Sequence, residues 1–174
     1  MPCSWPCPKL FFRRKHDLSG TGQILVWTDT SLHGIQFIGT PYTFGQRQLG
    51  ANCGLIAQHA AIEVNGRAYW MSDDAFYLYD GVVKKMPCSV QDYVFDDINN
   101  NALGDVFCAS NTDFNEVIWF YPTSGSSVVN KQVTYNYFDS SPQRPVWTVG
   151  TLARTMWKDS AVFGTPHATE YSAS

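Results

Sequence analysis

The sequence predicts an all-β fold: a partial β-propeller of about two full four-stranded antiparallel blades, parts of others and one short helix. Aromatic residues make up 15% of the chain, and large flat side chains suit a half-buried pleated surface. Five tryptophans lie inside β-like runs of sequence: Trp27, Trp70, Trp119, Trp147 and Trp157. Short strand patterns separated by turn residues, and an internal repeat, complete the prediction.

The repeat aligns NGRAYWMS with NEVIWFYP, which places Trp70 and Trp119 in equivalent positions. AFYLYDG resembles VTYNYFDS further along each block. Repeats of about 40 to 50 residues with four strands each are typical of propeller blades. A plain β-sandwich also repeats hairpins, so the sandwich stays open as an alternative.

Residues 1–22 are expected to form a poorly ordered arm, because prolines at positions 2, 6 and 8 lack the backbone donors of a strand ladder. The partial propeller is expected over 23–174. Its first piece is a hairpin over 23–40, with a polar turn near Asp29. A long irregular connection, rich in glycine and proline, is expected to follow it.

The clearest block covers 57–87 and predicts one complete blade. Its turns are expected at Asn65-Gly66, Asp73-Asp74 and Asp80-Gly81. Asn-Gly between strand patterns is the strongest short hairpin signal, because both central positions of a type I′ turn need positive φ.

A short amphipathic helix is expected over 88–99, with Ser89 as its N-cap and apolar residues spaced by four. A second complete blade is predicted over 104–150. The start of a further blade is expected over 151–165.

The formal net charge is −3, but the basic residues Lys9, Arg13, Arg14 and Lys15 face only Asp17 in the first twenty residues. The remaining chain has 8 basic and 14 acidic residues and a net charge of −6. An acidic body argues against a surface that grips phosphates. Five cysteines at irregular spacing favour reduced assembly in the cytosol, and no apolar run is long enough for a spanning helix.

Candidate metal sites are weak. Cys3, Cys7 and His16 lack a second ligand pair for zinc, and the prediction is that no metal binds there. Asp92, Asp96 and Asp97 could bind calcium or act as acid and base, but a solvated helix face is favoured. No cofactor is predicted.

Catalytic and nucleic-acid signals are also weak. Four scattered histidines have no catalytic context, so the chain is predicted not to be an enzyme. The basic pair Lys84-Lys85 is interpreted as lysines that discourage pairing at a strand edge.

Several motifs in order resemble one family: ILVWTDTSLHGIQFIGTPYTFG, NCGLIA, YWMSDDAFYLYDG, MPCSVQDYVFDDIN, FNEVIWFYP and GTLARTMW. They resemble the packaged-DNA stabilisation and tail-nozzle proteins of short-tailed phages, over about 23–164. The residues that carry this resemblance are structural: Trp27, Asp29, Tyr69, Trp70, Asp80, Gly81 and Trp119.

The resemblance implies a virion structural protein of the tail, assembled in the host cytoplasm. Such a protein would form a hexameric ring with portal or adaptor proteins and the needle or tip, retain packaged DNA and conduct it during ejection. No catalytic residues come with the family. An acidic lining that does not grip DNA would suit the channel, whereas Arg67, Lys84, Lys85 and Arg154 in the channel would contradict that idea.

Family members are several hundred residues long, so this chain is expected to be a truncated or partial gene product, in which the propeller ring is open and the terminal strands are unprotected edges. Residues 1–22 do not continue the family's β pattern. An alternative function is a carbohydrate-binding or hydrolysing propeller of a receptor-directed tail protein, with Asp73 and Asp74 as its candidate residues. A partial propeller with no activity of its own, prone to aggregate through open edges, is a third possibility.

Overall fold

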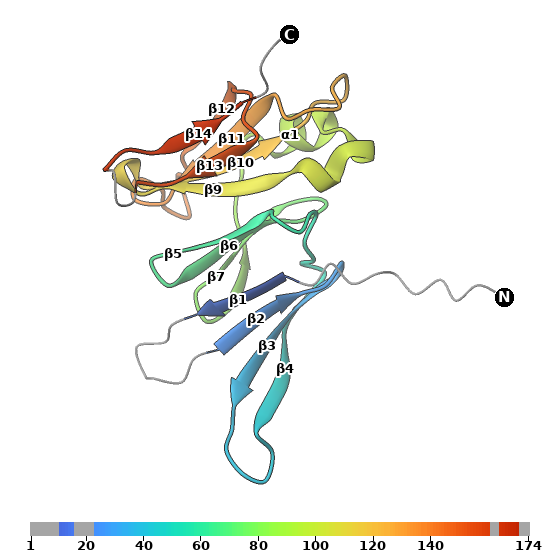
Figure 1. Cartoon of the computed structure of the whole chain (residues 1–174), viewed down its shortest axis with the longest axis vertical. Coiled ribbons are helices and arrows are strands. Elements are labelled where there is room, and N and C mark those ends of the chain that lie inside the picture. The colour runs from blue at the N-terminus through green and yellow to red at the C-terminus, as the bar shows by residue number, and fades with distance from the viewer. Residues whose placement is uncertain (1–10, 16–22, 161–163, 171–174) are drawn as a thin grey trace, which may run out of the picture.

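The computed structural model describes residues 11–15, 23–160 and 164–170. The molecule is mostly β, with 48% strand and 11% helix, and its large sheets are antiparallel and four-stranded. Figure 1 shows these sheets stacked one above another along the long axis. No closed barrel or propeller occurs in the described part of the chain. The predicted all-β class, with four-stranded antiparallel sheets and one short α-helix, is confirmed, whereas the propeller arrangement stays a prediction.

The first sheet has the order β1-β2-β3-β4 and occupies the lower end in Figure 1. Its strands are β1 (Phe11–Lys15), β2 (Gln23–Trp27), β3 (Ser31–Phe37) and β4 (Phe44–Ala51). Every strand pairs antiparallel with the next along the chain, and a register irregularity lies between Leu32 and His33 in the β3–β4 pair. This sheet is larger than the hairpin expected over 23–40.

Two expectations about the first sheet need correction. Phe11–Lys15, expected within a poorly ordered arm, forms β1 and pairs with β2, the next strand along the chain, so backbone bonds to that strand supply what the pattern of 1–22 does not show. Residues 1–10 and 16–22 lie outside the described part. Phe44–Ala51, expected in an irregular connection, forms β4 on β3. Its exposed, glycine-containing sequence has no apolar alternation, so only long-range pairing reveals it.

The second and third sheets repeat the same meander, with orders β5-β6-β7-β8 and β9-β10-β11-β12. The second sheet contains β5 (Ala61–Val64), β6 (Arg67–Met71), β7 (Phe76–Tyr79) and β8 (Val83–Lys85). The third contains β9 (Phe107–Asn111), β10 (Glu116–Tyr121), β11 (Lys131–Asn136) and β12 (Trp147–Thr151). They fall within the stretches for which two complete blades were predicted.

Short helices join these two sheets: α1 (Gln91–Asp97) and the 3₁₀ helix η1 (Asn100–Asp105). A second 3₁₀ helix, η2 (Thr112–Phe114), connects β9 with β10. The predicted amphipathic character is present, since Val94 and Ile98 are buried. The predicted N-cap Ser89 is wrong: the cap is Val90, and no side chain bonds to the first turn. The helix is held by its buried face instead.

The chain's last pair of described strands, β13 (Met156–Lys158) and β14 (His167–Thr169), forms a two-stranded sheet. Strand β10 explains how the layers are held together, because nearly all its side chains are buried. Val117, Trp119 and Tyr121 belong to the main core, whereas Ile118 and Phe120 belong to a smaller core against which Trp157 packs. Alternation along one strand therefore joins two layers.

Candidate functional site between the second and third sheets

The predicted motif tryptophans occupy equivalent places in the fold. Trp27, Trp70 and Trp119 are each buried on the second strand of their sheet. The indole Nε1 of Trp70 donates to the carbonyl oxygen of Cys53 at 2.9 Å, and that of Trp119 donates to Ala60 at 3.1 Å. Both indoles thus bond the segment between β4 and β5, Trp70 from the second sheet and Trp119 from the third, which ties these two layers to one connecting segment.

Aromatic rings continue this connection between the sheets. The rings of Trp27 and Trp70 meet edge to face at 5.6 Å, joining the first sheet to the second. Phe76 of the second sheet lies 4.9 Å from Trp119 and 4.8 Å from Trp147 of the third. Such ring pairs stabilise an interface beyond the area they bury. The tryptophans that suggested a repeat are the contacts that stack it.

Asp29 lies in the turn between β2 and β3, and its backbone is approached very closely by Gly54. The backbone N–H groups of Cys53 and Leu55 donate to the carbonyl oxygens of Thr30 and Thr28, both at 3.1 Å. A Cβ at position 54 would lie 1.8 Å from the Asp29 carbonyl oxygen. The site therefore requires glycine for space.

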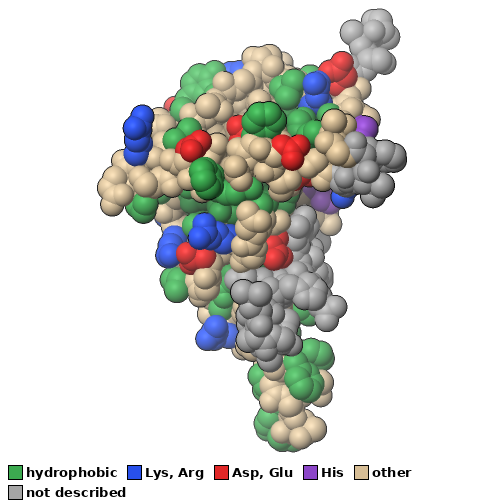
Figure 2. Space-filling view, turned by 90° about the vertical axis from the view of Figure 1, so that its left-hand side faces the viewer, with side chains coloured by type: hydrophobic (Ala, Val, Ile, Leu, Met, Phe, Trp, Pro, Cys, Tyr) green, Lys and Arg blue, Asp and Glu red, His purple; other side chains and the backbone are tan. Residues whose placement is uncertain are grey.

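A cavity of about 360 Å³ opens between the second and third sheets, and we call it the tyrosine–lysine groove. Its lining comes from both sheets and from the loop after β11: Arg67, Tyr69, Leu78, Asp80, Lys84, Lys85, Met86, Pro87, Tyr135, Tyr137, Ser140, Ser141, Pro142 and Pro145. On the side where the β5–β6 turn lies, Figure 2 shows basic and acidic side chains together on the middle of the molecule. The groove therefore combines rings, prolines and charges.

Tyrosine rings form the inner wall of the groove. The ring of Tyr69 lies 6.1 Å from that of Tyr135 and 6.3 Å from that of Tyr137. Burial raises the pKa of Tyr69, and a hydrogen bond from Arg67 opposes that change. Tyr69 therefore remains a neutral phenol, and the exposed Arg67 lies two residues before it on β6.

The charged rim is only partly neutralised. Lys84 donates to the Asp80 carboxylate at 2.7 Å, and this bond holds the pKa of Asp80 below its ordinary value. Lys85 lies 3.8 Å from Asp74, and both of these side chains are more than half exposed. Exposed pairs of this kind contribute little to stability and leave the cation available to solutes.

Two serines complete the rim. The Ser140 hydroxyl oxygen accepts from the Val146 N–H at 2.8 Å, and that of Ser141 accepts from Arg144 at 3.1 Å. Each oxygen is held as an acceptor, so its own proton can be donated to an anion.

A second cavity, of about 530 Å³, lies where the first strands of neighbouring sheets meet. A parallel bridge joins Phe107 of β9 to His59, which lies just before β5. The Cys108 N–H donates to the His59 carbonyl oxygen at 2.8 Å. Trp157 of β13 donates to the Ser110 carbonyl oxygen at 2.9 Å. We call this cavity the first-strand cavity.

The acidic residues considered as chemical sites have ordinary surroundings. Lys131 donates to the Asp97 carboxylate at 2.8 Å and to the Tyr93 hydroxyl oxygen at 2.7 Å, and these two bonds raise the pKa of the lysine. Asp92 and Asp96 are exposed on α1. Within the described ranges, no group of three or more His, Cys, Asp or Glu side chains could hold a metal ion. The candidate zinc residues Cys3, Cys7 and His16 lie outside those ranges.

Sequence reasoning predicted Tyr69 and Asp80 as structural motif residues, and both line the groove. It did not predict the groove itself. Tyr135 and Tyr137 are two apart around the end of one strand, which was a signal that both side chains share a face. The Lys84-Lys85 pair was interpreted only as edge protection.

A scan against protein-family models matches no family, and a search of the curated proteins finds no match. The likeness to tail-nozzle proteins therefore stays a prediction from the sequence motifs. No helix in the described part of the chain is both long and apolar enough to cross a membrane.

Proposed function

We propose that this chain is a structural, non-enzymatic part of the tail of a short-tailed phage, a segment of the nozzle ring that retains and conducts packaged DNA. The observation that carries the proposal is the repeated meander, stacked through a tryptophan on each second strand. The motifs that resemble nozzle proteins coincide with these contacts. Three successive four-stranded antiparallel sheets support this proposal.

The orientation of the blades within a complete ring follows from which strands approach one another. The first strands of the second and third sheets meet at the His59–Phe107 bridge, and β13 also lies against β9 through Trp157. In a propeller the strands that converge in this way surround the central axis. We therefore assign the first-strand cavity to the axial side.

The charges are distributed in a way that favours weak contact with DNA on that side. Exposed Asp105 lines the first-strand cavity. Arg67, Lys84 and Lys85 line the tyrosine–lysine groove, which is formed by other strands. Because grip on nucleic acid depends on basic residues, an axial side without these three cations suits passage of DNA.

The assembled form would be a hexameric ring in contact with portal or adaptor proteins and with the tail needle or tip. The test is mass spectrometry and electron microscopy of virions from the phage that encodes the chain. We expect the chain in purified virions, with antibody against the β3–β4 hairpin labelling the tail. Its absence from virions, or labelling of the head alone, would overturn the proposal.

The alternative carbohydrate function rests on Asp73 and Asp74, which are exposed in the turn between β6 and β7. The Ser72 N–H donates to the Ala75 carbonyl oxygen at 2.8 Å across this turn. Neither aspartate lines either cavity described above. A tight hairpin turn accounts for the pair, so the tail function is preferred.

A further inference from the structure

We propose that the tyrosine–lysine groove binds a sugar that carries a tetrahedral oxyanion, a phosphate or sulfate monoester. The proposal goes beyond the tail function and does not depend on it. It rests on the positive charge of the groove, its rings and prolines, its hydroxyl donors and its size.

The charge comes first. Three cations, from Arg67, Lys84 and Lys85, line the groove against one carboxylate, Asp80. The groove thus has a formal charge of +2 on a chain whose net charge is −3. A local excess of cations within a concave surface attracts anions, because its walls focus the field.

The arrangement of the cations favours an oxyanion with several acceptor oxygens. Arg67 lines the groove from β6, two residues before the buried Tyr69, and its planar fork can bond two oxygens of one anion. Lys85 is exposed and only loosely paired with Asp74. The hydroxyl protons of Ser140 and Ser141 add two neutral donors. A phosphate or sulfate offers enough oxygens for this set.

The remainder of the lining fits the body of a sugar. Tyr135 and Tyr137 present half-buried rings, and Pro87, Pro142 and Pro145 add rigid apolar surface. The ring C–H groups of a sugar pack on such surfaces, while its hydroxyls reach the tyrosine and serine oxygens. Rings together with donors favour a sugar ester over a bare inorganic anion.

The size and extent of the groove favour a small ligand over a nucleic-acid strand. Its volume of about 360 Å³ falls within the range of small-molecule sites, roughly 300 to 1,000 Å³. A nucleic-acid strand would need a track of basic residues along its phosphate backbone, whereas the three cations of the groove lie within one cavity of an acidic chain.

The experiment measures binding of the full chain by isothermal titration calorimetry. The probes are glucose 6-phosphate, glucose 6-sulfate, glucose, inorganic phosphate and a short oligodeoxythymidine. The variants are Arg67→Gln and Lys85→Gln, with Lys158→Gln as the control. Lys158 is also an exposed strand lysine, lies on β13 and does not line the groove, so the control removes the same charge elsewhere.

We expect the sugar esters to bind more tightly than glucose or inorganic phosphate. Arg67→Gln should raise the dissociation constant of the sugar esters by about tenfold or more, since it removes a charged hydrogen-bond donor. Lys85→Gln should raise the dissociation constant by a smaller factor, and Lys158→Gln should leave it unchanged. Near-ultraviolet circular dichroism of each variant checks that the fold is intact.

Several results would overturn the proposal. One is the absence of sugar-ester binding by the folded protein, and another is equal weakening by Lys158→Gln. Tighter binding of the oligonucleotide than of any sugar ester would assign the groove to nucleic acid. Equal affinity for inorganic phosphate would leave the rings without a role. The outcome is independent of whether the chain is found in virions.

Discussion

Gly54→Ala tests whether the turn after β2, which contains Asp29, is in close contact with the segment around Gly54 that follows β4. The added Cβ would lie 1.8 Å from the Asp29 carbonyl oxygen and 2.6 Å from the Thr30 nitrogen, whereas ordinary contacts begin at 3.4 Å. The two backbones must separate by roughly 1.6 Å, and backbone atoms cannot rotate away as a side chain can.

Such a separation stretches the two bonds that flank Gly54, from the N–H groups of Cys53 and Leu55. Each backbone bond contributes about 1 kcal/mol net, and overpacking strain costs about 1–3 kcal/mol. We therefore expect Gly54→Ala to lower the free energy of unfolding by about 3–5 kcal/mol.

The assay is urea unfolding followed by tryptophan fluorescence, with Gly104→Ala as the matched control. A Cβ at Gly104 meets nothing within 4 Å, and its φ is not positive. The control should change the free energy of unfolding by less than about 0.5 kcal/mol. Equal unfolding midpoints for the two variants would refute the close approach at Gly54.

Three further predictions concern other contacts. Trp119→Phe should lower the free energy of unfolding by about 1–3 kcal/mol in the same assay, because it removes the bond to Ala60 and leaves space in the core. Burial raises the pKa of Asp159, but bonds from Ser110 and two backbone N–H groups outweigh it and hold the pKa below 3.8. Its charge therefore stabilises the fold at neutral pH, and this contribution declines as pH falls from 3.8 through the lowered pKa. Asp159→Asn should therefore destabilise the fold at about pH 7 and progressively less as pH falls below that range. Burial raises the pKa of Cys88 to about 11. Because the thiolate is the reactive form, alkylation of Cys88 in the folded chain should accelerate only as pH approaches that value, whereas in the unfolded chain it should accelerate near pH 9.0. Peptide mass spectrometry measures the alkylation rate in both states.

Local chemistry made parts of the fold predictable from the sequence. Asn65 and Gly66 adopt φ values of 52° and 74°, as the Asn-Gly signal predicts for a hairpin turn. Trp70 and Trp119 lie on the second strands of successive sheets, in keeping with the repeat. These features depend on one residue's preference or on a pattern within a few residues.

The remaining features depend on contacts between distant segments. The β3–β4 pair joins Ser31 to Ala51, and nothing in the alternation of β4 indicates a partner. The groove likewise requires the second sheet and the loop after β11 to meet, which brings Arg67 to Tyr137. A sequence pattern shows which side chains share a face, but not which two faces pack together.

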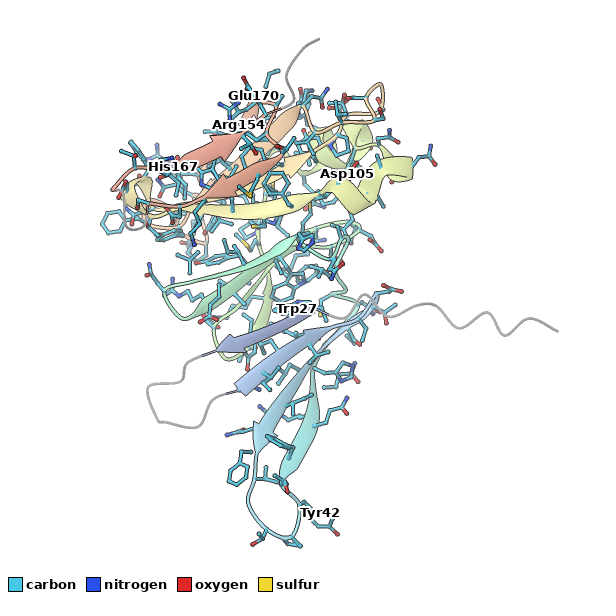
Figure 3. All side chains as sticks on the ribbon, in the orientation of Figure 1. Trp27, Tyr42, Asp105, Arg154, His167 and Glu170 are labelled. Carbon is cyan, nitrogen blue, oxygen red and sulfur yellow. The ribbon has the colours of Figure 1, made fainter. Side chains whose placement is uncertain are left out.

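Stability is expected to differ between the ends of this stack. The second and third sheets supply most of the buried core, whereas the first contributes chiefly Leu25, Trp27 and Leu32. Its far end is the hairpin that carries Tyr42, which projects away from the other sheets in Figure 3 and is 72% exposed. Regions with few buried contacts open at lower free-energy cost than the core.

The first sheet is thus coupled to the rest through the Trp27–Trp70 ring contact, the backbone bonds around Gly54 and a bond of 3.2 Å from the Tyr79 hydroxyl to the Gln23 side-chain oxygen. Because Trp70 also bonds the Cys53 carbonyl oxygen beside Gly54, a change at Gly54 acts on the first two of these contacts, and its cost falls on the first sheet before the others. The second and third sheets keep their own connections through Phe76 and Trp119. Each junction in this open stack therefore depends on a few contacts.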